Sequence, residues 1–145
     1  MKAVVQRVNK ARIEVKGRLV SEIGNGLMIL LGVAKGDTEG QTKALAEKCA
    51  RIRIFEDQNG KFNLSLLDIK GEALVASQFT LLADTSRGRR PSFVNAEAPE
   101  RAEKLYELFI TLLNKSGVPT KGGIFGERMN ITLENRGPVT IILEE

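Results

Sequence analysis

The residues best placed to do chemistry stand near the end of a long apolar run. Residues 72 to 82 are almost entirely apolar, but Ser77, Gln78 and Thr80 interrupt the pattern on either side of Phe79. Polar side chains within such a segment cost free energy unless they are hydrogen bonded. Either the strand emerges into solvent here, or these residues form a pocket wall that offers two hydroxyls, an amide and nearby backbone N–H groups.

The absence of histidine restricts what such a pocket can do. The chain has no histidine and a single cysteine, which excludes Ser-His-Asp and Cys-His arrangements and a structural zinc site. Without a base beside it, the hydroxyl of Ser77 or Thr80 is a poor nucleophile. Stabilising an oxyanion or orienting a substrate is physically easier. That suffices only for a labile substrate such as an activated ester, and we expect neither a metal nor a cofactor.

A second unusual feature is a proline inside a strand pattern. Residues 129 to 144 are rich in β-branched and apolar residues on both sides of Gly137-Pro138. Proline cannot donate to a sheet ladder, so it is expected at strand edges, strand starts or bulges. A Gly-Pro bond can also be cis at modest cost. From these residues alone, we favour a hairpin turn between two C-terminal strands.

Part of the mild positive charge is concentrated in a group of three arginines. The net charge is +4 and the isoelectric point is near 9.4, which permits a polyanionic partner. Arg87, Arg89 and Arg90 lie in a segment rich in turn-forming residues. Guanidinium groups can fork onto phosphate oxygens. This segment is therefore either a solvated loop or a phosphate-binding one.

Other motifs have ordinary explanations. Residues 121–126 are rich in glycine but lack the spacing of a phosphate-binding loop. A plain connection is favoured there, although the ring of Phe125 can stack on a base. Cys49 lies in an apolar helical stretch and is expected to be a buried small hydrophobe. The adjacent carboxylates at 56–57 and 144–145 are typical of solvated surface.

Hydrophobic periodicity and turn signals predict the elements that must position these residues. A capping box at Thr38 and Gln41 begins a helix that runs to about Cys49. Pro99 begins a second helix, which Gly117 ends. The run 72–82 is predicted to be a strand buried on both faces. The other predicted strands cover residues 2–8, 11–23 with a turn at 16–18, 27–34, 51–56, 62–66, 118–121, 129–135 and 139–143.

This order of elements predicts one domain over residues 1–145. Strands dominate both ends and two helices interrupt them, which favours an α+β fold with antiparallel or mixed sheets covered by helices. The longest apolar run, 26–34, is far shorter than the ~20 residues that a membrane helix needs. The N-terminus lacks a signal-peptide pattern, and a lone cysteine suits a reducing compartment. We therefore expect a cytoplasmic protein without a membrane segment.

Taken together, two short motifs resemble a known family. Residues 77–81, Ser-Gln-Phe-Thr-Leu, and 135–140, Asn-Arg-Gly-Pro-Val-Thr, are similar to the signature motifs of D-aminoacyl-tRNA deacylases. The intervening segment 84–93 and the N-terminal residues 1–8 also resemble that family. The resemblance covers the whole chain, in order and at the expected length.

The resemblance implies a homodimeric, metal-free cytoplasmic hydrolase with a three-layer β/β/α fold. Its members cleave the ester that joins a D-amino acid to the 3′-terminal adenosine of tRNA, and they also act on glycine mischarged onto alanine tRNA. Their Gly-Pro bond is cis and enters the partner's pocket, so Gly137 and Pro138 would form a chiral filter. The adenosine and the ester would be held by Ser77, Gln78, Phe79 and Thr80, with Phe125 and Met129 near the adenosine.

Two other functions stay open. A non-catalytic RNA-binding module, such as a translation accessory factor, fits the mild positive charge. It leaves a polar cluster beside a kinked strand unexplained. A dimeric small-ligand binder would use Gly137-Pro138 as an interface element. Only the hydrolase is expected to remove a D-amino acid from tRNA selectively.

Overall fold

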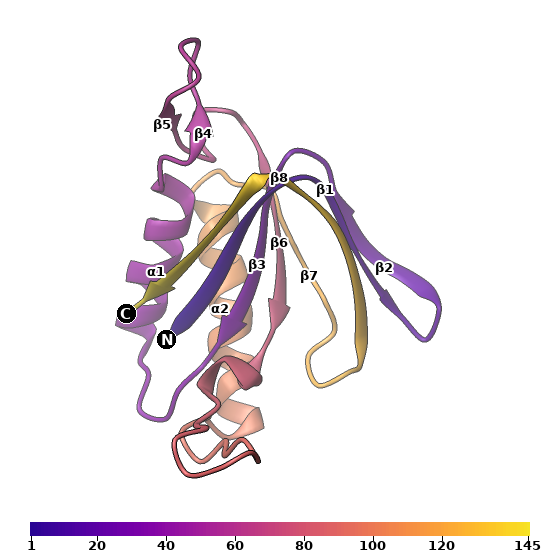
Figure 1. The fold of residues 1–145 in the computed structure, drawn as a ribbon, viewed down its shortest axis with the longest axis vertical. Coiled ribbons are helices and arrows are strands. Elements are labelled where there is room, and N and C mark those ends of the chain that lie inside the picture. The colour runs from indigo at the N-terminus through magenta and orange to yellow at the C-terminus, as the bar shows by residue number, and fades with distance from the viewer.

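Two long antiparallel strands run through the fold. The computed structural model describes residues 1–145 (Figure 1). In chain order the elements are β1 (Lys2–Val15), β2 (Arg18–Ile23), β3 (Gly26–Gly32), α1 (Glu39–Arg51), β4 (Phe55–Glu56), β5 (Phe62–Leu64), β6 (Glu72–Ser77), the 3-10 helix η1 (Phe79–Leu82), α2 (Pro99–Lys115), β7 (Thr120–Gly122) and β8 (Met129–Glu144). The two long strands, β1 and β8, pair along almost their whole length.

The main sheet is mixed. Its order is β2-β1-β3-β6-β7, and β8 takes the free edge of β1. The strands β3, β6 and β7 are parallel to one another, whereas β1 is antiparallel to β2, β3 and β8. A separate two-stranded ribbon joins β4 to β5. The predicted α+β class with mixed sheets and two main helices is confirmed.

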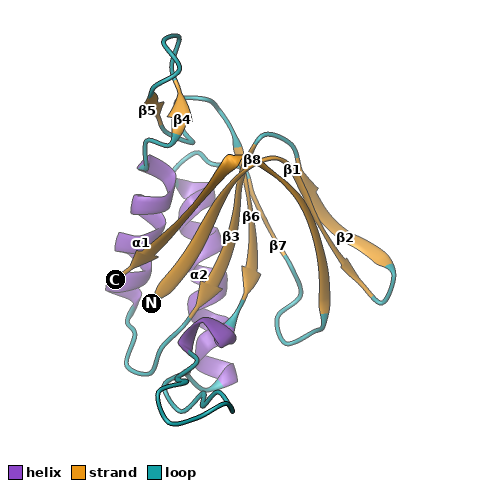
Figure 2. Ribbon diagram, viewed as in Figure 1, coloured by secondary structure: helices purple, strands orange, loops and turns teal.

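Three layers follow from where the strands turn. Both helices cover one face of the sheet (Figure 2). Residues 11–15 of β1 and 129–133 of β8 swing away from the other strands together with β2, and these three segments form the outer β layer. One apolar cluster lies between the helices and the sheet, and a second lies between the sheet and this outer β layer. In β6, Ala73 and Val75 belong to the first cluster, while Leu74 and Ala76 belong to the second. This is a β/β/α arrangement, and β6 is buried on both faces as predicted.

Local sequence signals fix both helices. Thr38 accepts from the backbone N–H of Gln41, and the Gln41 side chain accepts from the backbone N–H of Thr38, so the predicted capping box is present. Pro99 occupies the first turn of α2. Gly117 follows the helix with φ +95°, a conformation that favours glycine. The predicted helix starts and the second helix end are therefore confirmed.

Three predicted boundaries are wrong. The strand predicted over 72–82 ends at Ser77, and residues 79–82 form a 3-10 turn. The first helix continues to Arg51, which leaves only Phe55–Glu56 of the strand predicted over 51–56. The gap predicted at residues 9–10 is absent, because β8 pairs with β1 on both sides of it. In each case tertiary pairing or packing outweighs the local apolar pattern.

The Gly137-Pro138 segment is not a hairpin turn. β8 is one strand from Met129 to Glu144, and both halves pair with the same strand, β1. Between the pairs Gln6↔Thr140 and Val8↔Asn135 the register shifts. Residues 136–139 are therefore a bulge in a continuous strand, and the peptide bond at Gly137-Pro138 is cis. Bulges are where an edge strand tolerates a proline.

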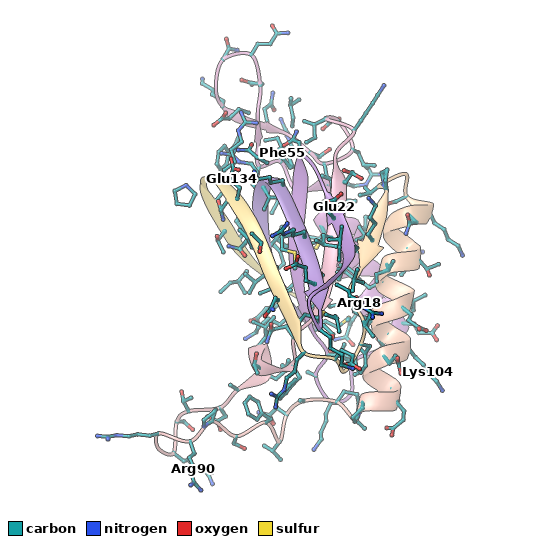
Figure 3. The ribbon with its side chains drawn as sticks, turned by 90° about the vertical axis from the view of Figure 1, so that its right-hand side faces the viewer. Arg18, Glu22, Phe55, Arg90, Lys104 and Glu134 are labelled. Carbon is teal, nitrogen blue, oxygen red and sulfur yellow. The ribbon has the colours of Figure 1, made fainter.

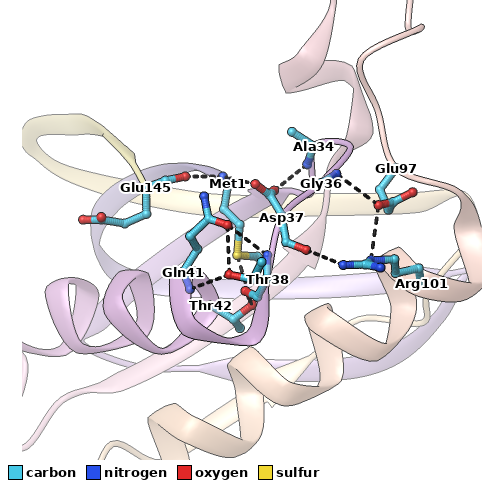
Figure 4. A network of polar contacts seen from close by, with 10 residues as sticks. All are labelled: Met1, Ala34, Gly36, Asp37, Thr38, Gln41, Thr42, Glu97, Arg101 and Glu145. Atoms are coloured by element: carbon cyan, nitrogen blue, oxygen red, sulfur yellow. Dashed lines mark hydrogen bonds and ion pairs between the residues drawn. The ribbon is translucent and has the colours of Figure 1, made fainter.

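A buried ion pair ties the chain ends to the helices (Figure 4). The amino group of Met1 lies 2.8 Å from the Asp37 carboxylate and also donates to the backbone carbonyl of Glu145. Asp37 accepts from the backbone N–H of Ala34 as well, and its own carbonyl accepts from Arg101 of α2. These contacts thus hold together the loop before α1, the start of α2 and the ends of β1 and β8.

None of the helices has the length and apolar character that spanning a membrane requires.

The start of β3 leaves no room for a side chain at Gly26. A Cβ there would lie 1.9 Å from the carbonyl oxygen of Glu72, which belongs to the backbone of β6 and cannot rotate away. We expect Gly26→Ala to lower the free energy of unfolding by about 3 kcal/mol or more. Gly40→Ala, on the exposed side of α1, is the control and should be neutral or stabilising by about 0.5–1 kcal/mol. Urea unfolding measures both, and equal effects would contradict the close approach.

Candidate active site

A mainly apolar recess opens at the end of the sheet where β6 stops. It is a cavity of about 520 Å³, which is within the range of small-molecule sites. Its walls come from the ends of β3 and β6, the first turns of α2, the loop after β7 and the start of β8. The lining residues are Leu31, Val33, Ser77, Gln78, Phe79, Ala96, Glu97, Pro99, Ala102, Tyr106, Phe125, Gly126, Glu127, Met129 and Ile131.

The chain turns sharply at the end of β6 because its last residues pack over β3. The backbone N–H of Gln78 donates to the carbonyl of Leu31 at 2.8 Å, and the 3-10 turn begins directly afterwards. A Cβ at Gly32 would lie 2.5 Å from the Leu82 side chain and 3.0 Å from the Gln78 carbonyl oxygen. Glycine at this position therefore lets residues 78–82 close over the strand.

The polar residues of this segment are both at a strand end and on a cavity wall. Ser77, Gln78 and Phe79 line the cavity. Thr80 lies outside the lining, and its hydroxyl accepts from the Gln78 side-chain amide. The two explanations considered from sequence, an emerging strand and a pocket wall, thus describe the same place.

Another part of the cavity wall is held by a tyrosine on α2. The Tyr106 hydroxyl donates to the carbonyl of Val75 at 2.9 Å and accepts from the backbone N–H of Gly123 at 3.0 Å. Its ring lies 5.8 Å from that of Phe125. A Cβ at Gly122 would lie 2.8 Å from the Tyr106 hydroxyl. The glycine-rich loop is therefore more than a connection, because its lack of side chains lets this wall close.

Two carboxylates and no cationic side chain line the cavity. The backbone N–H of Ala98, followed by that of Gly36 and by nearby Arg101, holds the pKa of Glu97 below its usual value, so Glu97 is an anion. Lys16 lies 3.2 Å from the Glu127 carboxylate. Arg101 likewise lies 3.3 Å from the Glu97 carboxylate, so both carboxylates are paired with cations from outside the lining. Cys49 lies elsewhere, and burial raises its thiol pKa to about 12, which removes it as a nucleophile.

The second motif lies at the other end of the sheet. Ser77 pairs with Leu31 at the end of β3, whereas Gly137-Pro138 lies beside Arg7, opposite the beginning of β3. In Figure 1 the bend of β8 is at the far end of the sheet from the 3-10 turn. Within one chain, Gly137-Pro138 therefore cannot line the cavity.

Buried polar contacts hold the β8 bulge from both sides. Arg7, which is 3% exposed, donates to the carbonyls of Arg136 and Ile54 at 2.9 and 2.8 Å. The Asn135 side chain spans the bulge, because its oxygen accepts from the Val139 N–H at 2.7 Å and its amide donates to the Val139 carbonyl at 3.2 Å. Residues 136–138 are exposed nonetheless. The bulge is thus a fixed protrusion of backbone at a sheet edge.

The arginine segment projects from the body near the cavity. Asp84 and Ser92 close it through paired backbone hydrogen bonds of 2.8 Å, and Arg87, Arg89 and Arg90 between them are exposed. Figure 3 shows Arg90 at the tip of this loop, pointing away from the sheet.

The chain matches the family described as D-Tyr-tRNA(Tyr) deacylase over residues 4–144. It belongs to this deacylase family. Proteins named D-aminoacyl-tRNA deacylase from Persephonella marina and Aquifex aeolicus are 56% and 54% identical to it, and each alignment covers 99% of this chain and 97% of the relative. The resemblance drawn from the two motifs is therefore confirmed.

Solved structures share the whole fold of this deacylase family. A protein named c-Myc DNA Unwinding Element Binding Protein is 40% identical, with a TM-score of 0.94 over 100% of this chain and 99% of that one. A probable eukaryotic D-amino acid tRNA deacylase is 17% identical, with a TM-score of 0.82 over 99% and 98% of the two chains. At that identity the second likeness shows the fold alone.

The cavity brings together five of the eleven residues predicted for a deacylase site. Ser77, Gln78 and Phe79 share the cavity with Phe125 and Met129, although far apart in sequence. Thr80, Gly137-Pro138 and the three arginines lie outside it. Tyr106, Glu97 and Glu127 were missed. A tyrosine within a helical stripe of leucine and phenylalanine was the available signal for the first, since a buried phenol needs a hydrogen-bond partner.

Tyr106 gives a pH-dependent test of this wall. Burial raises its pKa from 10.0 to about 12, so above pH 10 the folded protein keeps a proton that the unfolded chain releases. Its stabilising contribution is full below pH 10 and is lost as the pH rises through about 12. We expect Tyr106→Phe to cost about 1 kcal/mol at neutral pH and to show a shallower loss of stability across that alkaline window.

Urea unfolding at a series of pH values measures this difference. Cys49→Ala is the positive control, because burial raises the pKa of Cys49 from 9.0 to about 12 and its removal should also make the loss of stability shallower, beginning near pH 9. A Tyr106→Phe variant with the parent's alkaline slope would contradict the role given to the phenol.

Proposed function

We propose that this chain hydrolyses the ester that joins a D-amino acid to the 3′-terminal adenosine of tRNA. The observation that carries the proposal is the meeting of Ser77, Gln78 and Phe79 with Phe125 and Met129 around one cavity. Membership of the deacylase family and relatives named D-aminoacyl-tRNA deacylase support it. The aromatic and thioether side chains suit a nucleoside, and the polar edge of β6 suits the ester.

The chemistry follows from a labile substrate and a chain without histidine. Water adds to the ester carbonyl, the bond to the ribose oxygen breaks, and the proton passes to that oxygen, which releases free amino acid and tRNA. The neighbouring ribose hydroxyl helps to position or activate the water. Backbone N–H groups at Phe79 and Thr80 stabilise the oxyanion. The Thr80 hydroxyl, which accepts from the Gln78 side chain, orients the substrate through Gln78 rather than attacking it.

Selectivity for the D-form comes from a second copy of the chain. The Gly137-Pro138 bulge is exposed and lies at the opposite end of the sheet from the cavity of its own chain. In a homodimer it enters the partner's cavity, where its carbonyls accept from the substrate's ammonium group. An L-amino acid that made the same contact would drive its side chain into this backbone.

Glycine has no side chain for such a wedge to exclude. The same cavity therefore accepts glycine mischarged onto alanine tRNA as a further substrate. Exposed Arg87, Arg89 and Arg90 contact the tRNA phosphates, and the reaction takes place in the cytoplasm, where aminoacyl-tRNA is used.

Incubation of the purified protein with D-tyrosyl-tRNA and L-tyrosyl-tRNA tests the activity. Selective loss of the D-ester is expected. A non-catalytic nucleic-acid-binding protein, the function that the name of the 40% identical structure suggests, would bind both tRNAs and leave both esters intact. A small-ligand binder would bind neither, so each rival gives its own result.

Substitution in the bulge tests the wedge. A Cβ at Gly137 would lie 2.8 Å from the Val139 side chain and 3.0 Å from an Arg7 guanidinium nitrogen, so Gly137→Ala must move the backbone. We expect the ratio of D- to L-ester hydrolysis to fall at least about 10-fold, since even ~1.4 kcal/mol of lost exclusion gives that factor. Gly88→Ala is a matched control, because Gly88 has the same φ of +137° and nothing within 4 Å. An unaltered ratio in Gly137→Ala would remove the wedge from the proposal.

Salt dependence tests the arginine loop. The triple variant Arg87→Gln, Arg89→Gln, Arg90→Gln should bind tRNA more weakly and with a shallower slope of log affinity against log salt concentration, because fewer counterions are released. Fluorescence anisotropy with labelled tRNA at several salt concentrations gives the slope. The control is Lys104→Gln, an exposed cation on α2 (Figure 3). A slope equal to the parent's would mean that the three arginines do not contact tRNA phosphates and that the loop is simply solvated.

A further inference from the structure

An exposed phenylalanine, Phe79, and a half-buried one, Phe93, form a pair beside the cavity. The Phe79 side chain is 58% exposed, although the same residue lines the cavity. Phe93 packs against it edge to face, with ring centroids 5.0 Å apart and ring planes at 69°. This neighbour holds the Phe79 ring in place and leaves much of it uncovered. A single exposed apolar side chain is common, so the position of these rings between the cavity wall and a cationic loop has to carry the argument.

The pair lies between the cavity and the arginine loop. Residue 79 begins the 3-10 turn at the end of the cavity wall, and Phe93 directly follows the Asp84·Ser92 pair that closes the loop. The Phe93 carbonyl accepts from the Ala96 N–H at 3.0 Å, and Ala96 again lines the cavity. The two rings therefore connect the cavity wall to the base of the arginine loop.

We propose that Phe79 and Phe93 form a stacking platform for the unpaired nucleotides that precede the terminal adenosine of tRNA. This inference rests on the deacylase function proposed above. Single-stranded nucleic acid is bound by aromatic side chains together with a positively charged surface, because every base has a face that stacks and every linkage has a phosphate. The rings supply the first part and the exposed Arg87, Arg89 and Arg90 supply the second.

Substrates of different length test the platform. One is D-tyrosyl-tRNA, and the other is D-tyrosyl-adenosine, which lacks the preceding nucleotides. We expect Phe93→Ala to lower the ratio of kcat/KM for the tRNA to kcat/KM for the adenosine ester about 10-fold. Phe93→Leu, which keeps apolar volume without a stacking face, should lower it similarly, and Phe93→Tyr should retain it. Val94→Ala, at a side chain that is 61% exposed, is the control and should change neither kcat/KM.

Other results would overturn the platform. If Phe93 only supports the Phe79 backbone, Phe93→Ala slows both substrates equally. If the rings are an apolar contact, Phe93→Leu behaves like the parent. If a second copy covers the rings, Phe93→Ala lowers the molar mass measured by light scattering.

A binding measurement keeps this test separate from the proposed activity. Uncharged tRNA should bind the parent more tightly than the same tRNA trimmed of its unpaired 3′ nucleotides, and Phe93→Ala should abolish that difference. A parent that discriminates between the two tRNAs but hydrolyses neither ester would retain the platform and reject the deacylase function. A parent that binds both equally would reject the platform, whatever its activity.

Discussion

The burial of β6 on both faces is the constraint on which the rest of the structure depends. Residues 73–76 have no exposed side, because the helices cover one face and the outer β layer covers the other. Such a strand can carry only small or apolar side chains, since unpaired polar groups there would be costly. Polar groups can therefore appear only where it stops. Ser77 and Gln78 stand at that limit, so the core itself places the chemistry at one end of the sheet.

The same layering explains why a bulge is found at the opposite end. One half of β1 and of β8 lies in the main sheet and the other half lies in the outer β layer, so both strands change direction near their middle. The shift of register opposite Arg7 accommodates this change. Arg7 is buried there, and its guanidinium donates to the Arg136 carbonyl in the interrupted ladder and to the Ile54 carbonyl in the loop after α1, which satisfies both acceptors. A backbone protrusion fixed in this way is a by-product of folding one long strand into two layers, and it is available for recognition.

Features that depend on residues close together in the sequence were predicted correctly, and several features that depend on distant residues were not. The capping box at Thr38, the proline at the start of α2 and Gly117 after it act within a turn of chain, and all were predicted. The strand over 72–82 was predicted too long, because an apolar run does not say where its partner strand ends. The hairpin at Gly137-Pro138 was wrong since only the pairing with β1 decides between a turn and a bulge. Tyr106 was missed because its partners come from β6 and from the loop after β7.

In the proposed mechanism the cavity positions the ester and the Gly137-Pro138 bulge excludes the L-form, which suits a protein with few catalytic side chains. An aminoacyl ester is already activated, so positioning and oxyanion stabilisation contribute most of what hydrolysis needs. Discrimination is then the harder task, and steric exclusion by backbone is effective because it does not depend on a side chain that can rotate away. Because Gly137-Pro138 lies at the far end of the sheet from the cavity of its own chain, only another chain can bring this wedge to the site. The separation of the two motifs within one chain is what this arrangement requires, since two identical chains can then each complete the other's site.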